Sequence, residues 1–144
     1  MSRGRPDLRV VVLAAALGCA ATSGAETAAV LTGRVEREDG SALREEWVWV
    51  VWDKGAPFRF EEGSRRVLNP KARTGSDGGL RIEVPAGFFG PGDALALAWE
   101  EQGGGRSHFT ALHSADGERL GFELDELGRE TDFGRLIAPA PRPD

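Results

Sequence analysis

The chain has 144 residues with 18 basic and 23 acidic side chains, which gives a formal net charge of −5. An acidic domain without a basic cluster is a poor match to nucleic acid or to anionic lipid surfaces, so we expect no nucleic-acid partner. Its 20 glycines and repeated Asp-Gly pairs indicate many turns. The composition therefore favours an all-β domain over a helical one.

The first residues have the pattern of an export signal. Arg3, Arg5 and Arg9 precede a short apolar run at 10–17. A basic start followed by such a run is typical of a secretory signal, and the run is shorter than the about 20 apolar residues that cross a bilayer. No later stretch is long enough either. We expect an exported protein that is periplasmic, secreted or lipid-anchored to the cell envelope, with no transmembrane span.

Two processing sites are compatible with this signal. The small residues at 23–25 suit cleavage before Glu26, which leaves about 119 residues, enough for one domain. Alternatively, the segment 16–19 (Ala-Leu-Gly-Cys) resembles a bacterial lipobox, in which Cys19 is lipidated and anchors the protein. Cys19 is the only cysteine, so no internal disulfide can form. The expected divisions are a signal at 1–25, or one ending before Cys19, a single domain at 26–138 and a proline-rich tail at 139–144.

The first expected strand spans 28–38, and an Asp39-Gly40 turn leads from it to the run Trp47–Trp52. Every residue of this run is aromatic or β-branched, and these types favour the pleated backbone. Because side chains alternate across a strand, Trp47, Trp49 and Val51 face one way, and the other three residues face the opposite way.

Both faces of the Trp47–Trp52 strand are thus apolar, and two interpretations follow. The strand is covered on both sides as part of a core, or it presents an aromatic face to a sugar ring or a protein partner. On the second interpretation, Trp47 and Trp49 are candidate ligand-binding residues. A pair at Phe88 and Phe89 is a second candidate: it either forms an exposed binding tip or plugs one end of the domain.

The remaining chain predicts further short strands separated by glycine-rich turns. Alternation is clearest at 80–84. In the strand at 94–100, Leu95, Leu97 and Trp99 share one face, and the alanines on the other are small enough to lie under a neighbouring sheet. Seven or eight strands without sustained helical periodicity predict an antiparallel β-sandwich with Greek-key connections. The expected strand at 107–113 pairs with the strand at 94–100 as a hairpin, and two further strands are expected at 120–124 and 133–138.

Three segments in this order resemble the carboxypeptidase regulatory-like domain, a transthyretin-like (prealbumin-like) β-sandwich of exported bacterial proteins. They are Gly33-Arg34-Val35, the segment 39–43 running into the strand at 47–51, and the segment 74–88 with Thr74, Asp77-Gly78 and alternating apolar residues. A fainter match at 132–136 resembles the closing strand. The family usually has an aspartate where Gly75 stands.

The resemblance implies a role in binding or structure, because members of this family are mostly non-catalytic stalks, adhesion modules or accessory domains. We therefore expect a non-enzymatic module of the bacterial cell envelope whose partner is an envelope protein or a glycan. The second hypothesis is a carbohydrate-binding module that stacks sugars on exposed aromatics. A small hydrolase is a distant third, because the sequence lacks the constellations that such enzymes use.

The residues that can carry metal or acid–base chemistry are sparse. His108 and His113 are the only histidines, and on one strand at this odd spacing they point to opposite faces and cannot share a metal. Asp77, Asp93 and Asp116 lie in glycine-rich turns, where a short carboxylate usually accepts local backbone N–H bonds instead of binding calcium. We expect no catalytic residues, no metal site and no cofactor.

Overall fold

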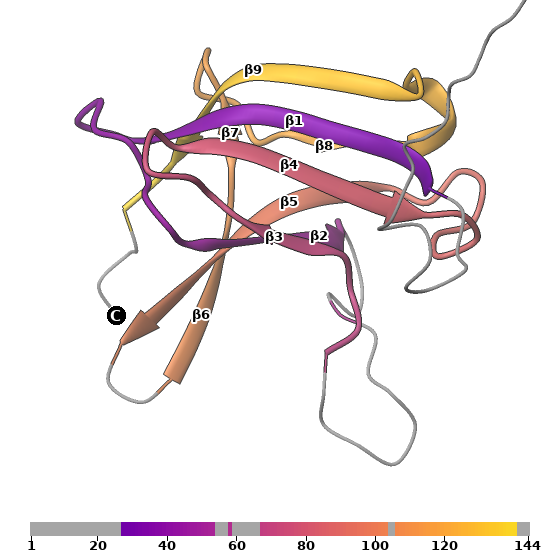
Figure 1. Ribbon diagram of the computed structural model, residues 1–144, viewed down its shortest axis with the longest axis horizontal. Helices are drawn as coiled ribbons and strands as arrows, with labels where there is room; N and C mark the ends of the chain where they lie inside the picture. The colour runs from indigo at the N-terminus through magenta and orange to yellow at the C-terminus, as the bar shows by residue number, and fades with distance from the viewer. Residues whose placement is uncertain (1–26, 54–57, 59–66, 104–105, 141–144) are drawn as a thin grey trace, which may run out of the picture.

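The computed structural model describes residues 27–53, 58, 67–103 and 106–140, whose strands form two facing sheets (Figure 1). Sheet A has the order β4-β1-β9-β7, and sheet B has the order β3-β2-β5-β6, with β8 also paired to β5. The predicted all-β sandwich is confirmed. The strands are β1 (Thr27–Arg37), β2 (Trp47–Trp52), β3 (Lys71–Arg73), β4 (Gly79–Pro85), β5 (Leu95–Gly103), β6 (Arg106–Ala111), β7 (His113–Ser114), β8 (Gly121–Phe122) and β9 (Glu130–Ala138), with one 3₁₀ turn, η1 (Leu124–Glu126).

The core lies between the two sheets and is built from alternate residues of the central strands. In β5, Leu95, Leu97 and Trp99 face inward, as their spacing predicts, and they meet Leu31 and Val35 of β1. Burying each such side chain contributes about 1.5–3 kcal/mol relative to leaving it in water. The inward residues of the other principal strands are Val48 and Val50 of β2, Leu80, Ile82 and Val84 of β4, and Leu136 and Ala138 of β9.

The chain crosses from sheet B to sheet A within the segment that the sequence predicts as one strand at 107–113. β6 ends at Ala111, buried Leu112 donates its backbone N–H to Leu97 of β5, and β7 begins at His113 in the other sheet. The expectation that His108 and His113 share one strand is therefore wrong. This break, together with β3, which the sequence does not predict, raises the strand count of the described residues to nine.

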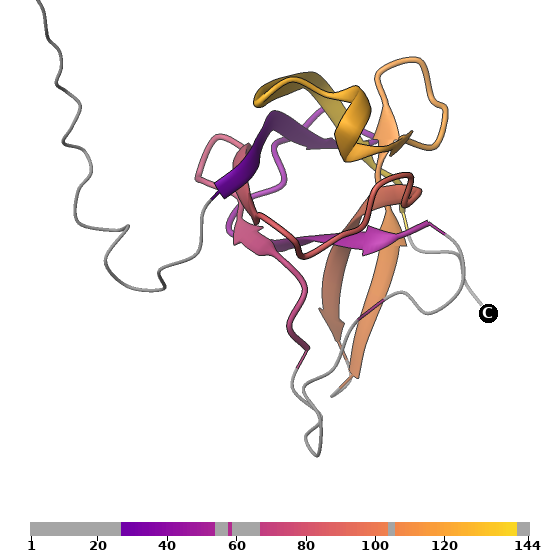
Figure 2. The same cartoon turned by 90° about the vertical axis from the view of Figure 1, so that its right-hand side faces the viewer.

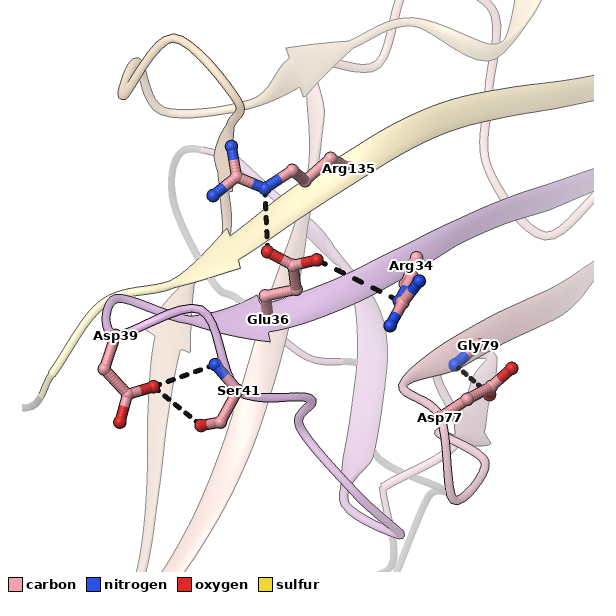
Figure 3. A network of polar contacts seen from close by, with 7 residues as sticks. All are labelled: Arg34, Glu36, Asp39, Ser41, Asp77, Gly79 and Arg135. Carbon is pink, nitrogen blue, oxygen red and sulfur yellow. Dashed lines mark hydrogen bonds and ion pairs between the residues drawn. The ribbon is translucent and has the colours of Figure 1, made fainter.

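β1 and β9 lie side by side in the middle of sheet A and run parallel, which the antiparallel prediction does not include. Their register shifts between Thr32 and Arg34, where Gly134 has a positive φ of 72°. Beyond this bulge, Glu36 of β1 accepts a hydrogen bond from Arg135 Nε of β9 at 2.7 Å and faces Arg34 on its own strand (Figure 3). The two strands are thus joined by side chains as well as by their backbones.

The segment that begins at Thr74 ties the start of β4 to the chain before β2. Thr74 is buried, and its hydroxyl accepts the backbone N–H of Glu46 at 3.0 Å. Asp77 accepts the N–H of Gly79 at 2.9 Å (Figure 3), and the carbonyl of Gly78 accepts the N–H of Val35 at 2.9 Å. The threonine, aspartate and glycine of this sequence motif therefore each have a specific role in closing the turn.

The outer faces of the two sheets differ in chemistry. The outward residues of sheet A are mostly polar or charged, such as Arg34, Arg81 and Glu83, with Val30 and Ile137 as apolar exceptions. The outward residues of sheet B are largely apolar and form a second buried cluster of Trp49, Val51, Ala96 and Ala98. The alanine face of β5 is covered by Phe58 and Val67 from the connection after β2, and not by a neighbouring sheet as the sequence suggested.

Candidate functional site

The outer face of sheet B brings aromatic and charged side chains into cross-strand rows. In the first row, Arg73 of β3 pairs with Trp47 of β2, Trp47 with Glu100 of β5, and Glu100 with Phe109 of β6. The next row begins with Lys71 opposite Trp49. We call the surface made by Trp47, Trp49, Phe58, Lys71, Arg73, Glu100 and Phe109 the outer aromatic face.

The aromatic rings of this face pack against one another. The Phe58 and Phe109 ring centroids are 4.4 Å apart, and the Trp49 ring lies edge-to-face with Phe58 and Phe109 at centroid distances of 5.6 and 6.3 Å. Such tilted and edge-to-face pairs contribute about 0.5–1.5 kcal/mol beyond the area that they bury. Trp49 is only 5% exposed, whereas Phe109 is 41% exposed. The cluster therefore has a buried base at Trp49 and an open margin at Phe109.

Charged side chains contact both indoles of this face. Trp49 Nε1 donates to Glu100 Oε1 at 2.9 Å. Lys71 Nζ lies 4.4 Å from the Trp47 ring centroid and 4.6 Å from that of Trp49, and Arg73 lies 5.7 Å from the Trp47 ring. At an exposed site each of these cation–π contacts contributes about 0.5–1 kcal/mol. The cations therefore compete with any sugar ring for the indole faces.

The structure thus brings Trp47 and Trp49 together on one face, as predicted, but only the neighbourhood of Trp47 and Phe109 is accessible. Sequence reasoning missed Lys71, Arg73, Phe58 and Phe109. For Lys71 and Arg73 a weak signal exists, because two cations in alternation after Pro70 fit a short edge strand. The position of Phe109 depends on the pairing of β5 with β6, and nothing local to its sequence indicates it.

Phe88 and Phe89, the other predicted candidates, lie in the loop between β4 and β5, beside Trp52 at the end of β2. Phe89 is 8% exposed, with its ring centroid 4.9 Å from Trp52, and Phe88 stacks on Trp52 at 6.2 Å. Trp52 Nε1 donates to Asp93 Oδ2 at 3.2 Å, and the same oxygen accepts the N–H of Gly90. These contacts place the two phenylalanines against the main core.

A cavity of about 610 Å³ opens beside Phe89. Its walls come from the start of β1, the loop between β4 and β5, and the segment around η1, including Leu124, Leu127, Asp125 and Arg129. The volume falls within the range of small-ligand pockets, about 300–1,000 Å³. Phe89 therefore forms part of a cavity wall, and is not an exposed tip.

The turn aspartates are engaged locally. Asp116 Oδ1 accepts from the Ser114 hydroxyl and from the N–H of Glu118, and Asp39 Oδ1 accepts both the N–H and the hydroxyl of Ser41. The Ser41 hydroxyl, followed by the Ser41 N–H, holds the pKa of Asp39 below its ordinary value of 3.8. The Ser114 hydroxyl does the same to the pKa of Asp116. These carboxylates therefore act as turn caps.

His108 lies in sheet B and His113 in sheet A, on separate strands. Within 27–53, 58, 67–103 and 106–140, the structure has no group of three or more histidine, cysteine, aspartate or glutamate side chains placed to hold a metal ion. The same described ranges contain no helix long and apolar enough to cross a membrane. The predicted signal and Cys19 lie outside the described residues.

The fold and this face define an all-β sandwich with one charged and one aromatic outer surface. No family model matches the sequence, and no curated protein matches it. Among solved structures, the chain is similar to a 9R-lipoxygenase from Cyanothece, with 18% identity and a TM-score of 0.44. The match covers 76% of this chain but 16% of the lipoxygenase chain, and similarity at this level carries no argument about activity.

Proposed function

We propose that this chain is exported to the bacterial cell envelope and acts there as a non-enzymatic binding module. It binds a protein partner through the outer aromatic face. The observation that carries the proposal is the contrast between the two sheets. One outer surface is mostly polar or charged, whereas the other has partly buried Trp47 and exposed Phe109, with Lys71 and Arg73 beside Trp47. Aromatic residues and arginine are enriched in protein interfaces, where they supply most of the binding energy.

The arrangement of charge also favours a protein partner. Arg73 lies at one end of the first row, and the carboxylate of Glu100 lies between the two aromatics. A polypeptide can offer apolar side chains to Phe109 and a carboxylate to Arg73 at once. The motifs shared with carboxypeptidase regulatory-like domains support the same assignment, because that family mostly serves in adhesion, as stalks or beside enzymes. The proposed location is the periplasm, the cell surface or a lipid anchor at Cys19.

The test is photo-crosslinking in the living host with a benzoyl-phenylalanine at position 71. The matched control places the same group at Arg81, an exposed cation of sheet A. We expect a discrete adduct from position 71, absent at position 81 and lost when Arg73→Glu is added. Adducts that are the same at both positions, or that survive Arg73→Glu, would contradict the proposal.

A carbohydrate-binding role is the second candidate, and one observation favours it. Phe109 is 41% exposed, so one aromatic ring at the margin of the outer aromatic face is accessible for stacking. A glycan array with the wild type and Phe109→Ala decides between the two candidates. Saturable binding of one glycan class that Phe109→Ala abolishes would establish the sugar role, whereas a blank array together with the crosslink at position 71 would leave the protein partner.

A further inference from the structure

Edge strands of open sheets have outward backbone groups that can pair with another strand, and proteins usually protect them with short length, proline or charge. Among the described residues, the edge strands other than β6 have such protection, and β8, which pairs with β5 alone, is only two residues long. β7 is two residues long, and β3 is three residues long, follows Pro70 and includes Lys71 and Arg73. β4 places Arg81 and Glu83 outward and ends at Pro85.

The edge strand β6 lacks this protection. It has six residues and contains no proline, and its single formal charge, Arg106, is at the end next to the hairpin connection. Its middle residue Phe109 is one of two large apolar side chains exposed in the described part of the chain, with Leu68 as the other. In both views, β5 and β6 extend together beyond β2 and β3 and away from sheet A (Figures 1 and 2).

The hydrogen-bond parity of β5 and β6 shows which backbone groups of this edge are free. Leu112 N–H donates to Leu97 O, and the register pairs Trp99 with Thr110 and Glu101 with His108. Along an antiparallel ladder, hydrogen-bonded residue pairs alternate with pairs that do not exchange hydrogen bonds. Thr110 and His108 therefore direct their backbone groups toward β5, as Leu112 does. The N–H and C=O groups of Phe109 and Ala111 therefore point off the edge of the sheet, beyond which the described residues place no strand.

We infer that β6 pairs with β6 of a second copy of this chain, antiparallel about a two-fold axis at Phe109. This register places Phe109 opposite Phe109 of the partner subunit, and His108 opposite Thr110 of the partner subunit. Aromatic cross-strand pairs stabilise such ladders, whereas opposed like charges destabilise them, and no carboxylates meet at these positions. A second copy fits because one strand supplies both halves of a self-complementary contact, as a two-fold interface requires.

The pairing joins the two copies of sheet B into one continuous sheet. The first rows of the two outer aromatic faces then meet at Phe109, so that two Trp47 and two Arg73 side chains lie along a single surface. This inference does not depend on the nature of the ligand, and it concerns the edge of the sheet and not its outer face.

The first test measures molar mass by light scattering and sedimentation over about 1–200 µM, a range that spans weak and moderately tight association. We expect a reversible dimer for the wild type. Phe109→Lys places two ammonium groups directly opposite each other and raises the dissociation constant at least about tenfold. Leu68→Lys is the matched control, because it makes the same change at the other exposed apolar side chain and leaves the dimer intact.

The second test addresses the backbone. Ala111→Pro removes an N–H that points off the edge, so the monomer keeps its fold, checked by near-ultraviolet circular dichroism, but the dimer weakens. Hydrogen exchange at Phe109 and Ala111 should slow as the concentration rises, with no such change at Arg81. A monomer at all concentrations, or a dimer unaffected by either Phe109→Lys or Ala111→Pro, would overturn the inference. Arg73→Glu leaves the mass unchanged, which separates this result from failure of the proposed binding face.

Discussion

Replacing Gly78 by alanine is the sharpest test of the turn that precedes β4. Gly78 has a φ of +86°, and a Cβ added there would lie 2.5 Å from the carbonyl oxygen of Val35. That oxygen accepts the N–H of Leu43 at 2.9 Å, and both Val35 and Leu43 are fully buried. The methyl group can fit only if the Val35 carbonyl moves, which breaks or weakens a buried hydrogen bond.

The magnitude follows from two terms. A left-handed backbone costs a residue with a Cβ about 1–2 kcal/mol. Leaving a buried N–H without its acceptor costs about 1–3 kcal/mol more. Gly78→Ala should therefore lower the free energy of unfolding by about 2–5 kcal/mol, a large share of the about 5–15 kcal/mol typical of a domain.

Gly117→Ala is the matched control. Gly117 has a similar φ of +91°, but its added Cβ has no heavy atom within 4 Å. The control isolates the conformational cost and should lower the free energy of unfolding by about 1–2 kcal/mol. The assay is urea unfolding followed by tryptophan emission, with the slope m checked for constancy. Equal losses in the two variants would refute the role assigned to the Val35 carbonyl.

Three further predictions concern the outer face, the turns and the N-terminus. Lys71→Ala uncovers the Trp47 and Trp49 rings and should raise the iodide-quenchable fraction of the emission, whereas an unchanged fraction would contradict the shielding by Lys71. Because the folded-state pKa of Asp116 is lowered, its stabilising effect is present above its unfolded value and is lost as the pH falls through the folded value. Asp116→Asn should therefore lose less stability than the wild type on acidification, and parallel acid profiles would count against this. Labelled palmitate should enter the wild type and not Cys19→Ser if the lipobox is used, whereas an unlabelled wild type would favour cleavage before Glu26.

The sequence predicts those strands whose own residue types and alternation indicate an extended backbone. The run Trp47–Trp52 forms a strand because all its residues favour the pleated backbone. In β4, alternation places Leu80, Ile82 and Val84 in the core. The polar strand β3 was missed, since Lys71–Arg73 has little intrinsic β preference and forms a strand because β2 offers it partners. Local pattern identifies strands that are amphipathic or uniformly apolar, but not those defined by a neighbour.

The candidate site was predicted in part for the same reason. The Trp47 and Trp49 indoles had to share a face, because alternation along one strand requires it. Whether that face was open depended on Phe58 and Phe109, which come from distant parts of the chain. The pair at Phe88 and Phe89 was assigned to two outcomes, and the contact with Trp52 across the sandwich decides between them.

The parallel pairing of β1 with β9 sets the order in which this chain can fold. β1 begins at Thr27 and its central neighbour ends at Ala138, so almost the whole described sequence must be available before sheet A is complete. Contacts of such long sequence separation close late and slow folding. A chain emerging from the ribosome thus cannot complete sheet A until β9 has been synthesised. Until then β1 lacks its neighbouring strand on that side. For a chain proposed to be exported, late closure of sheet A leaves time for translocation before the fold is complete.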